Sequence, residues 1–551
     1  MPKLSHQEWK FIVWIWLVVI FLSFLPVIIG IIRTPADSIF LGKQSLNGSD
    51  LQVYYSNIEQ IRDNHFLLKN LFTSEPHTRF IFDPVWLAIG LLAKIFQLSG
   101  FWAFQVGRFL TIPFLLLSCY WLVAIFFRDE LKRKVAFIFL IFASGFGGFY
   151  LQGIANNAGE LNFSVDSHGT AMLPIDVWIP EAFTFLSIYN SPHFIVSLIF
   201  IVLILSYSIL AFEKYRLVYS VLAGIFTFFL FFFHPYHVPT VLAVIGVFIL
   251  VYTIKERRIF VDYLKHFFVL LIFAAPPILY HWWVLQNFWV RKQHFLQNIT
   301  LLPIPGMILI GYGLLAPLAL IGILSILRNK EHDIKKVFMV SWFFTHATLI
   351  FLPFSFQRRL LEGLQLIIAI LAVTGLFYLK DILLTTRTRE NHIVVFSGSP
   401  FWVILFIVLF SFSWLQVLVG DIGLYFNEHR NVYISQGKVL AMQWIRENTK
   451  EEDIVISSVE SGNLIPAISV RQVYLGHSHQ TALSEDKLFE VKNFFLSHDD
   501  KTRIDFLSRQ GIDYLFFGQE EKAASSFNPA EKNYFIEVFK NDQVSIYKVE
   551  I

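Results

Sequence analysis

Charged residues and cysteines are scarce in this sequence. Only 15% of its 551 residues are charged, whereas soluble proteins carry about 25%. That scarcity excludes an ordinary soluble protein, and the formal net charge of +3 gives no support for a nucleic-acid partner. The single cysteine, Cys119, excludes a disulfide within the chain and a cysteine-ligated metal centre. The C-terminal region also lacks the glycine-rich fingerprints of nucleotide-binding loops.

Long apolar runs take the place of charge. They occupy residues 11–32, 84–99, 103–127, 135–151, 194–212, 217–233, 238–254, 266–286, 303–327, 336–354, 360–380 and 400–420. Runs of about 20 apolar residues are typical of membrane-spanning helices. We therefore predict an α-helical polytopic membrane protein. The first run is too long for the core of a signal peptide and no small-residue cleavage site follows it, so we expect it to be retained.

The basic loops indicate how many of these runs cross the membrane. Lysine and arginine in short loops mark the cytoplasmic side. If 84–99, the shortest run, lies in the outer interface, then the N-terminus and every basic loop fall on that side. This arrangement gives about eleven spans, outer loops at 34–102 and 152–193, and an extracytoplasmic C-terminal region. Residues 1–424 would form the transmembrane domain and 425–551 a soluble α/β domain, in which short apolar strands alternate with helices.

Asp50 opens an amphipathic segment soon after the first span. One face of that segment repeats apolar residues at spacings of three and four: Leu51, Tyr54, Tyr55, Ile58 and Ile61. Ser49 or Asp50 would suit the N-cap of such a helix, which is one interpretation of Asp50. The other is a carboxylate held at the membrane surface over a cavity. Both roles can coexist, because a cap fixes its side chain.

The second outer loop contains further titratable residues: Asp166, His168, Asp176, Glu181 and His193. Asp176 and Glu181 flank an aromatic, proline-containing stretch around Trp178. This stretch is either a solvated loop with its aromatic residues at the interface, or it completes an acid pair with Asp50 for a metal ion. His193 opens a span, either as an ordinary interfacial residue or as a hydrogen-bond donor to phosphate.

Arg358 and Arg359 lie at the predicted outer start of a span. Guanidinium groups bind phosphate bidentately, which makes them candidates for a phosphate site. The alternative is a local ion pair with Glu362, four and three residues away. The two adjacent arginines cannot both turn toward Glu362, so at least one is expected to have another partner.

Two histidine pairs resemble metal motifs at first sight. His234 and His237 bracket the turn HPYH, but two histidines alone make a weak metal site. His477 and His479, in GHSHQT, are expected to lie in a polar loop at a domain edge.

These features together resemble the GT-C superfamily of integral membrane glycosyltransferases, especially its uncharacterised bacterial and archaeal branch. The resemblance rests on Asp50 with Tyr54, on IPEAF and SPHF (179–183 and 191–194), on HPY (234–236) and on QRRLLEG (357–363). Many members carry two adjacent acids in the first outer loop. Here Asp50 stands between Ser49 and Leu51, so the usual acid pair is missing.

The resemblance implies inverting transfer of a hexosyl or pentosyl group from a polyprenyl-phosphate donor. The acceptor would be a glycan, lipid or protein on the outer face of the plasma membrane, in assembly of the cell envelope. Asp50 would be the base or orient the acceptor, and Arg358 and Arg359 would hold the lipid phosphate. The residues expected to line sugar or acceptor are Tyr54, Asp176, Glu181, His193 and His234. A divalent cation such as Mg²⁺ or Mn²⁺ is compatible with this chemistry.

Two other classes of protein fit part of the pattern. A carrier or flippase for lipid-linked glycans would also bind the donor. Ion-coupled carriers usually keep acids deep in their spans, whereas the middles of these predicted spans contain no Asp or Glu. That argues against coupled transport but not against passive flipping. A non-catalytic membrane scaffold would give no reason for acids and arginines on several outer turns.

Overall fold

The computed structural model describes residues 4–158, 173–328, 333–385, 405–406, 408–427, 432–524 and 526–551. The chain divides into two compact units. Unit 1 comprises residues 1–26, 108–280 and 300–421, and unit 2 comprises residues 27–107, 281–299 and 422–551. Helices α1, α4, α11 and α18 run from one unit into the other.

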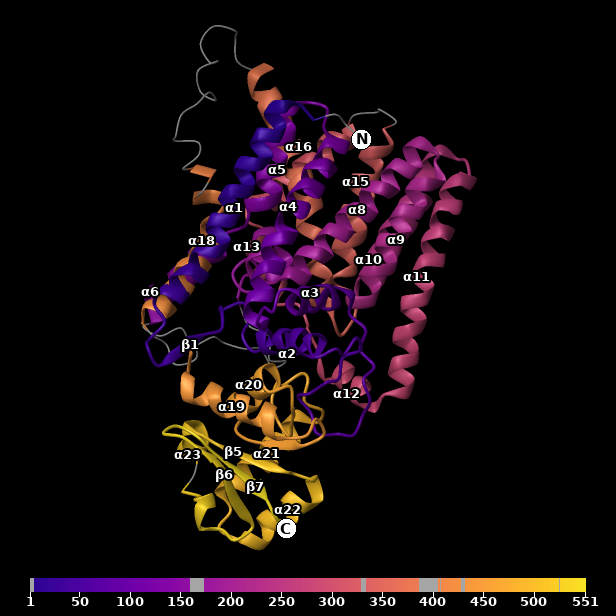
Figure 1. Ribbon diagram of the computed structural model, residues 1–551. Helices are drawn as coiled ribbons and strands as arrows, with labels where there is room; N and C mark the ends of the chain where they lie inside the picture. Colours follow the sequence, from indigo (N-terminus) through magenta and orange to yellow (C-terminus); the bar gives the residue numbers. More distant parts are fainter. Residues whose placement is uncertain are drawn as a thin grey trace. The chain divides into compact units, whose positions relative to one another are not determined.

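Unit 1 is built almost entirely of helices (Figure 1). They are α1 (His6–Ile32), α4 (Gly100–Phe126), α5 (Glu130–Phe142), α6 (Gly147–Ala158), α7 (Thr184–Asn190), α8 (Pro192–Lys214), α9 (Leu217–Phe233), α10 (His237–Glu256), α11 (Val261–Asn287), α13 (Pro305–Tyr312), α14 (Leu315–Arg328), α15 (Ile334–Leu349), α16 (Leu364–Thr385) and α18 (Phe412–Phe426), with 3-10 turns η1 (Pro180–Ala182) and η2 (Gln357–Leu361). Helix α8 packs against α9, and α10 packs against α15 (Figure 1). Most are apolar around their whole circumference, which is typical of membrane helices.

Seven of the described helices are long and apolar enough to cross a bilayer: His6–Ile32, Gly100–Phe126, Glu130–Ile154, Pro192–Lys214, His237–Glu256, Val261–Asn287 and Gln357–Ile382. Helices α13 and α14 pass the same test together, although the chain bends by 80° between them. This confirms a multi-pass helical protein. The count of eleven spans stays a prediction, because α9, α15 and α18 are shorter and part of 400–420 lies outside the described residues.

The run that was predicted not to cross, 84–99, folds as the 12-residue helix α3 (Pro84–Ile95). At 1.5 Å per residue such a helix is about 18 Å long, whereas the hydrocarbon core is about 30 Å thick. Asp83 begins α3 by accepting hydrogen bonds from the amides of Val85 and Trp86. Its length therefore agrees with a helix that does not span.

Helices α14 and α16 approach each other backbone to backbone. A Cβ atom on Gly322 would lie 2.1 Å from the carbonyl oxygen of Leu371, and one on Gly375 would lie 2.1 Å from that of Leu318. Small residues permit this close packing of membrane helices. The contact fixes α16, the helix that begins two residues after Glu362.

Unit 2 contains a mixed sheet flanked by helices. Its elements are β1 (Ser38–Phe40), α2 (Asp50–Arg62), α3, α12 (Trp289–Gln297), β2 (Tyr433–Ser435), α19 (Gln436–Asn448), β3 (Ile454–Ile456), α20 (Val459–Ile468), β4 (Gln472–Val473), α21 (Ser484–Leu496), α22 (Asp500–Gln510), β5 (Tyr514–Phe517), α23 (Gln519–Ala524), η3 (Pro529–Glu531), β6 (Phe535–Lys540) and β7 (Ser545–Val549). The strand order is β4-β3-β5-β7-β6. Strand β3 runs parallel to β4 and β5, and β7 runs antiparallel to β5 and β6. The predicted sheet-containing C-terminal region is confirmed.

The segment after the first helix packs against the C-terminal region within unit 2. Strand β1 pairs antiparallel with β2, with Ser38 opposite Ser435. Arg446 of α19 contacts Glu59 of α2 at 3.0 Å and Asp63, the residue just after α2, at 2.6 Å. The predicted domain boundary between residues 424 and 425 stays a prediction.

Candidate functional site

A buried cluster of two histidines and a glutamate lies in unit 1. His237 Nε2 is 2.7 Å from Glu362 Oε2, and His234 Nδ1 is 3.5 Å from the same oxygen. All three side chains are buried, and each offers one ligand atom within 4.8 Å of the other two. Two imidazoles and a carboxylate at this spacing are a recurrent ligand set for a metal ion.

Local structure brings the two histidines together. His234 follows the last residue of α9, and His237 is the first residue of α10. The amide of His237 donates to the carbonyl of His234 at 3.1 Å, which closes the turn. His234 Nδ1 is also 3.0 Å from Ser197 Oγ, and burial lowers the pKa of His234. The turn therefore presents two imidazoles side by side, at least one of them favoured as neutral.

His193 belongs to the same region. Its ring packs edge-on against that of His234, with centroids 5.2 Å apart. Its Nδ1 lies 2.7 Å from Ser191 Oγ, at the start of α8. The structure thus brings together two of the histidines singled out in the sequence, His193 and His234. A role in binding sugar or phosphate stays a prediction for both.

The two arginines share one buried acid, Glu181. Arg359 Nη1 lies 3.1 Å from Glu181 Oε1, and Arg358 Nε lies 3.6 Å from it. The Arg358 guanidinium also lies over the ring of Trp178, 5.2 Å from its centroid. With two positive groups facing one carboxylate, these three charged side chains carry a net charge of +1.

The local ion pair between these arginines and Glu362 does not form, so that alternative is wrong. Arg358 and Arg359 belong to the 3-10 turn η2, and Glu362, just after it, has extended backbone angles (φ −61°, ψ 123°). The change of backbone direction turns the Glu362 carboxylate toward His237 instead. The arginines within turn η2 therefore contact Glu181, whereas Glu362, just after the turn, contacts the histidines.

Asp176 is fully buried in unit 1. Its Oδ2 accepts hydrogen bonds from the amides of Gly145 at 3.0 Å and Gly147 at 3.1 Å. Burial raises the pKa of Asp176 to about 7, although these hydrogen bonds act in the opposite direction. The contacts tie the loop after residue 173 to the turn between α5 and α6. They give Asp176 a structural task, whereas contact with substrate stays a prediction.

In unit 2, Asp50 pairs with a histidine from the C-terminal region. His477 Nε2 lies 2.9 Å from Asp50 Oδ1, with the His477 side chain 3% exposed and that of Asp50 49% exposed. His477 lies in the loop between β4 and α21, as predicted, and its side chain is buried there; the position of this loop at a domain edge stays a prediction. Ser49 occupies the N-cap position of α2 without a side-chain cap hydrogen bond. Asp50 lies in the first turn and its carboxylate faces His477.

The predicted apolar face of α2 is confirmed. Leu51, Tyr55, Ile58 and Ile61 are buried, each at most 3% exposed. Tyr54 is partly buried and stacks on Trp86, with ring centroids 4.9 Å apart. Its aromatic ring is thus held by packing, and a role in binding substrate stays a prediction.

The predicted site residues are divided between the units. Asp50 and Tyr54 lie in unit 2, and the other six lie in unit 1: Asp176, Glu181, His193, His234, Arg358 and Arg359. The predicted convergence of Asp50 with the two arginines, or with Asp176 or Glu181, joins the two units and stays a prediction. Asp166 and His168 lie outside the described residues.

Sequence reasoning missed two partnerships. His237 and Glu362, 125 positions apart, join His234 in one cluster. His477 joins Asp50 from 427 positions away. The spacing His-x-x-His at a turn was a signal for two of the three residues of the first cluster, His234 and His237. No local signal pointed to Glu362 or to the pairing of Asp50.

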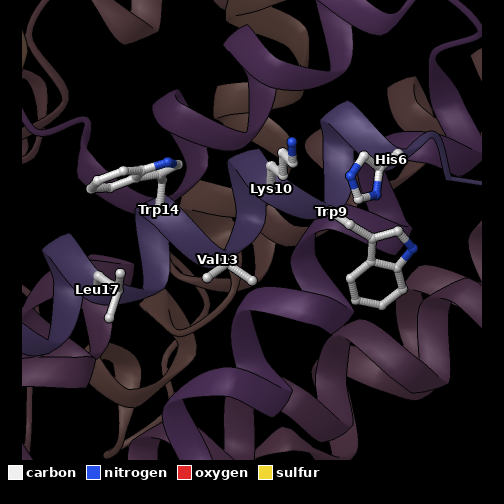
Figure 2. Close-up of a pocket in the computed structure, with 6 residues that line it drawn as sticks. All are labelled: His6, Trp9, Lys10, Val13, Trp14 and Leu17. Atoms are coloured by element: carbon white, nitrogen blue, oxygen red, sulfur yellow. The ribbon is translucent and has the colours of Figure 1, made fainter.

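A surface depression on α1 is a poor candidate for the site. Figure 2 shows its lining side chains on successive turns of one helix: His6, Trp9, Lys10, Val13, Trp14 and Leu17. It is almost wholly apolar and contains no acid. Exposed tryptophans on a helix of this length are typical of a face in contact with lipid.

No protein-family model matches the chain, and no curated protein sequence does either. Solved structures do match. The oligosaccharyltransferase of Archaeoglobus fulgidus is 14% identical with a TM-score of 0.54, over 96% of this chain and 73% of that one. ArnT from Cupriavidus metallidurans, bound to undecaprenyl phosphate, is 11% identical with a TM-score of 0.50, over 99% of this chain and 98% of that one.

A third match is the arabinofuranosyltransferase AftD from Mycobacteria. It is 13% identical with a TM-score of 0.50, over 100% of this chain and 42% of that one. All three are membrane glycosyltransferases of the GT-C type. At these identities the likeness establishes the architecture and leaves the reaction open. The chain therefore has the fold of the GT-C superfamily of membrane glycosyltransferases.

Proposed function

We propose that this protein is an inverting membrane glycosyltransferase that moves a hexosyl or pentosyl group from a polyprenyl-phosphate donor to an acceptor. The acceptor is a glycan, lipid or protein on the extracytoplasmic face of the plasma membrane. The fold supports this proposal, since ArnT was solved with undecaprenyl phosphate and the archaeal oligosaccharyltransferase with dolichol phosphate. In this topology the N-terminus is cytoplasmic and residues 425–551 are extracytoplasmic.

One observation carries the proposal most directly. Arg358 and Arg359 face the single carboxylate of Glu181, and each is at least 20% exposed, whereas Glu181 is 1% exposed. The acid is thus shielded, while both guanidiniums are partly exposed. Two accessible guanidiniums suit a lipid phosphate, whose negative charge grows as it leaves the sugar.

The proposed reaction is a single displacement. The acceptor oxygen bonds to the anomeric carbon while the bond from that carbon to the phosphate oxygen breaks. Asp50 takes the proton of the acceptor hydroxyl, and the bonding electrons leave with the phosphate between Arg358 and Arg359. Attack opposite the leaving group inverts the anomeric centre. Other residues line the sugar or the acceptor: Tyr54, Asp176, Glu181, His193 and His234.

A divalent cation such as Mg²⁺ or Mn²⁺ belongs to this proposal. Asp50, with Asp176 or Glu181, would supply oxygen ligands for it, which are the ligands that Mg²⁺ prefers. Bound there, the ion would neutralise charge on the phosphate or orient the acceptor hydroxyl. The archaeal oligosaccharyltransferase was solved with Zn and sulfate, at 13% identity and a TM-score of 0.51.

The experiment begins with donor-lipid binding. Purified full-length protein is titrated with undecaprenyl phosphate, and binding is followed by native mass spectrometry. Arg358→Gln and Arg359→Gln are expected to weaken binding about tenfold each, because each removes one charge-assisted contact. Arg328→Gln is the matched control, since this exposed arginine at the end of α14 lies outside the cluster. Equal affinity in all three variants would contradict the phosphate site.

Transfer is then measured with radiolabelled lipid-linked sugars in membranes that contain parent or Asp50→Asn protein at equal levels. The variant is expected to bind donor normally and to lose at least 100-fold in transfer rate, because the base is missing. If it transfers sugar as fast as the parent, the catalytic assignment fails. Movement of intact labelled lipid across liposomes without transfer would instead support the carrier.

A further inference from the structure

The strongest unassigned feature is the cluster of His234, His237 and Glu362. We propose that these three side chains bind one divalent first-row transition-metal ion, of the class of Zn²⁺. The proposal does not require the transfer reaction, although it shares His234 with the proposed sugar or acceptor site. It also differs from the oxygen-rich cation site considered above, because it uses neither Asp50 nor Asp176.

The geometry fits such an ion. Bonds of about 2.0–2.1 Å in a tetrahedral site place neighbouring ligand atoms about 3.4 Å apart. His234 Nδ1 and Glu362 Oε2 are 3.5 Å apart. His237 Nε2 is closer to Oε2, at 2.7 Å, but the second oxygen, Oε1, is buried without a hydrogen-bond partner among the described residues. A small rotation of the carboxylate therefore gives the ion a ligand oxygen without breaking another contact.

The electrostatics also favour a bound cation. Glu362 is 1% exposed, and an isolated carboxylate at such a position is costly. A hydrogen bond from His237 satisfies Oε2 alone and leaves His234 at 3.5 Å, beyond good hydrogen-bonding distance. A divalent ion would use both imidazoles and the carboxylate at once.

Ser197 and His346 lie next to the ligands. Ser197 Oγ lies 3.0 Å from His234 Nδ1, the nitrogen that would bind the ion, so metal binding would replace this hydrogen bond. His346, also fully buried, is not a ligand: Trp342 donates to its Nδ1 at 3.3 Å, and its Nε2 donates to the Leu360 carbonyl at 2.7 Å. His346 thereby anchors the chain two residues before Glu362. Metal ligands are usually supported by such outer contacts.

The donor set selects the class of ion. Two imidazoles with one carboxylate occur in catalytic zinc sites, which keep a fourth position open for water or another oxygen ligand. Mg²⁺ and Ca²⁺ prefer oxygen ligands and are disfavoured here. The ion would clamp the turn between α9 and α10 to residue 362, just after the turn that carries Arg358 and Arg359.

The test uses full-length protein in detergent, stripped with EDTA and then equilibrated with Zn²⁺ or Co²⁺. Metal content is measured by mass spectrometry after gel filtration. We expect one ion per chain, and at least a tenfold loss of affinity in Glu362→Gln and His237→Ala. His266→Gln is the matched control, because this buried histidine lies outside the cluster and its ring nitrogens contact Ser220 and Ser208. It should keep full metal content.

Loss of metal in a variant could also result from misfolding, so a second experiment looks for a new absorption band. His237→Cys with Co²⁺ should show a thiolate-to-cobalt charge-transfer absorption that the parent lacks, because cysteine replaces one ligand with another. Zn²⁺ should also raise the melting temperature of the parent more than that of Glu362→Gln. The proposal is overturned if the parent retains no ion, if Glu362→Gln and His237→Ala bind as much as the parent, or if the cysteine variant shows no new band. Loss of sugar transfer with metal content intact would concern the proposed function alone.

Discussion

His477 Nε2 lies 2.9 Å from Asp50 Oδ1, although 427 positions separate the two residues in the chain. The imidazole is buried and the carboxylate is half exposed. The orientation of Asp50 is therefore set by the C-terminal region. Because its orientation is already fixed, such a carboxylate can accept a proton without an entropic cost for ordering its side chain.

His477→Ala is expected to lower the rate of sugar transfer about tenfold, or about 1.4 kcal/mol of activation free energy. The donor KM should stay unchanged, because His477 positions the proposed base and does not bind the lipid. His477→Gln should restore part of the rate, since its amide can donate to Asp50. The measurement is a pH–rate profile of labelled transfer in membranes. The exposed neighbour His479, changed to Gln, is the control. Parental profiles in both His477 variants would exclude the positioning role.

Glu181→Gln should strengthen binding of undecaprenyl phosphate two- to fivefold. Removing the acid leaves Arg358 and Arg359 without their shared carboxylate, so the local charge rises from +1 to +2 for these side chains. The variant should also melt at a lower temperature until lipid is added. Titration at low and high salt measures the effect, which should shrink as salt screens the charges. Weaker lipid binding in this variant would assign Glu181 to substrate contact instead of charge balance.

Asp176→Asn should make stability less dependent on pH. The folded pKa of Asp176 is about 7, above the ordinary value of 3.8, so the folded state binds more protons between these values. Stability from this group is full below about pH 4 and is lost as pH rises toward 7. The variant keeps an oxygen acceptor for Gly145 and Gly147, and should gain up to about 4 kcal/mol over the parent at pH 8. Melting temperatures at pH 5 and pH 8 check this.

The exposed Asp262 provides the control for that experiment. Its side chain is 54% exposed and pairs with nearby Lys265, so Asp262→Asn should shift both melting temperatures little. If Asp176→Asn destabilises equally at both pH values, the carboxylate is charged in the folded protein. Retained sugar transfer in the variant would support the structural role over substrate contact.

Gly322→Ala should lower stability by about 1–3 kcal/mol. The added methyl group would lie 2.1 Å from the Leu371 carbonyl oxygen, so α14 and α16 would have to separate. Gly306→Ala is the control, because a Cβ atom there meets nothing within 4 Å. Thermal unfolding in detergent distinguishes the two variants. Similar melting temperatures would show that the helix pair tolerates a wider spacing.

Much of the architecture could be predicted because its signals are local. Apolar runs predicted the helices of unit 1. Alternating strand and helix patterns predicted the order of elements after residue 436. The period of three and four residues after Asp50 correctly predicted the buried face of α2. The shortness of α3 agreed with its exclusion from the spans.

The site was harder to predict, because its contacts join distant segments. Glu362 was paired with the nearest cations, Arg358 and Arg359, since spacing along a helix is all that a sequence shows. Turn η2 breaks that helix and sends the acid to His237. Likewise, GHSHQT has the composition of an exposed loop, and only the tertiary fold buries His477 against Asp50.

The pairing of β1 with β2 has a consequence for biogenesis. Residues 38–40 leave the ribosome long before their partners at 433–435 are made. At about 5–20 residues per second, the first strand waits for roughly 20 to 80 seconds. Throughout that interval the strand edge and the part of α2 that packs against α20 lack their native cover. Assembly of this region therefore follows synthesis of the C-terminal segment, long after α2 has met α3.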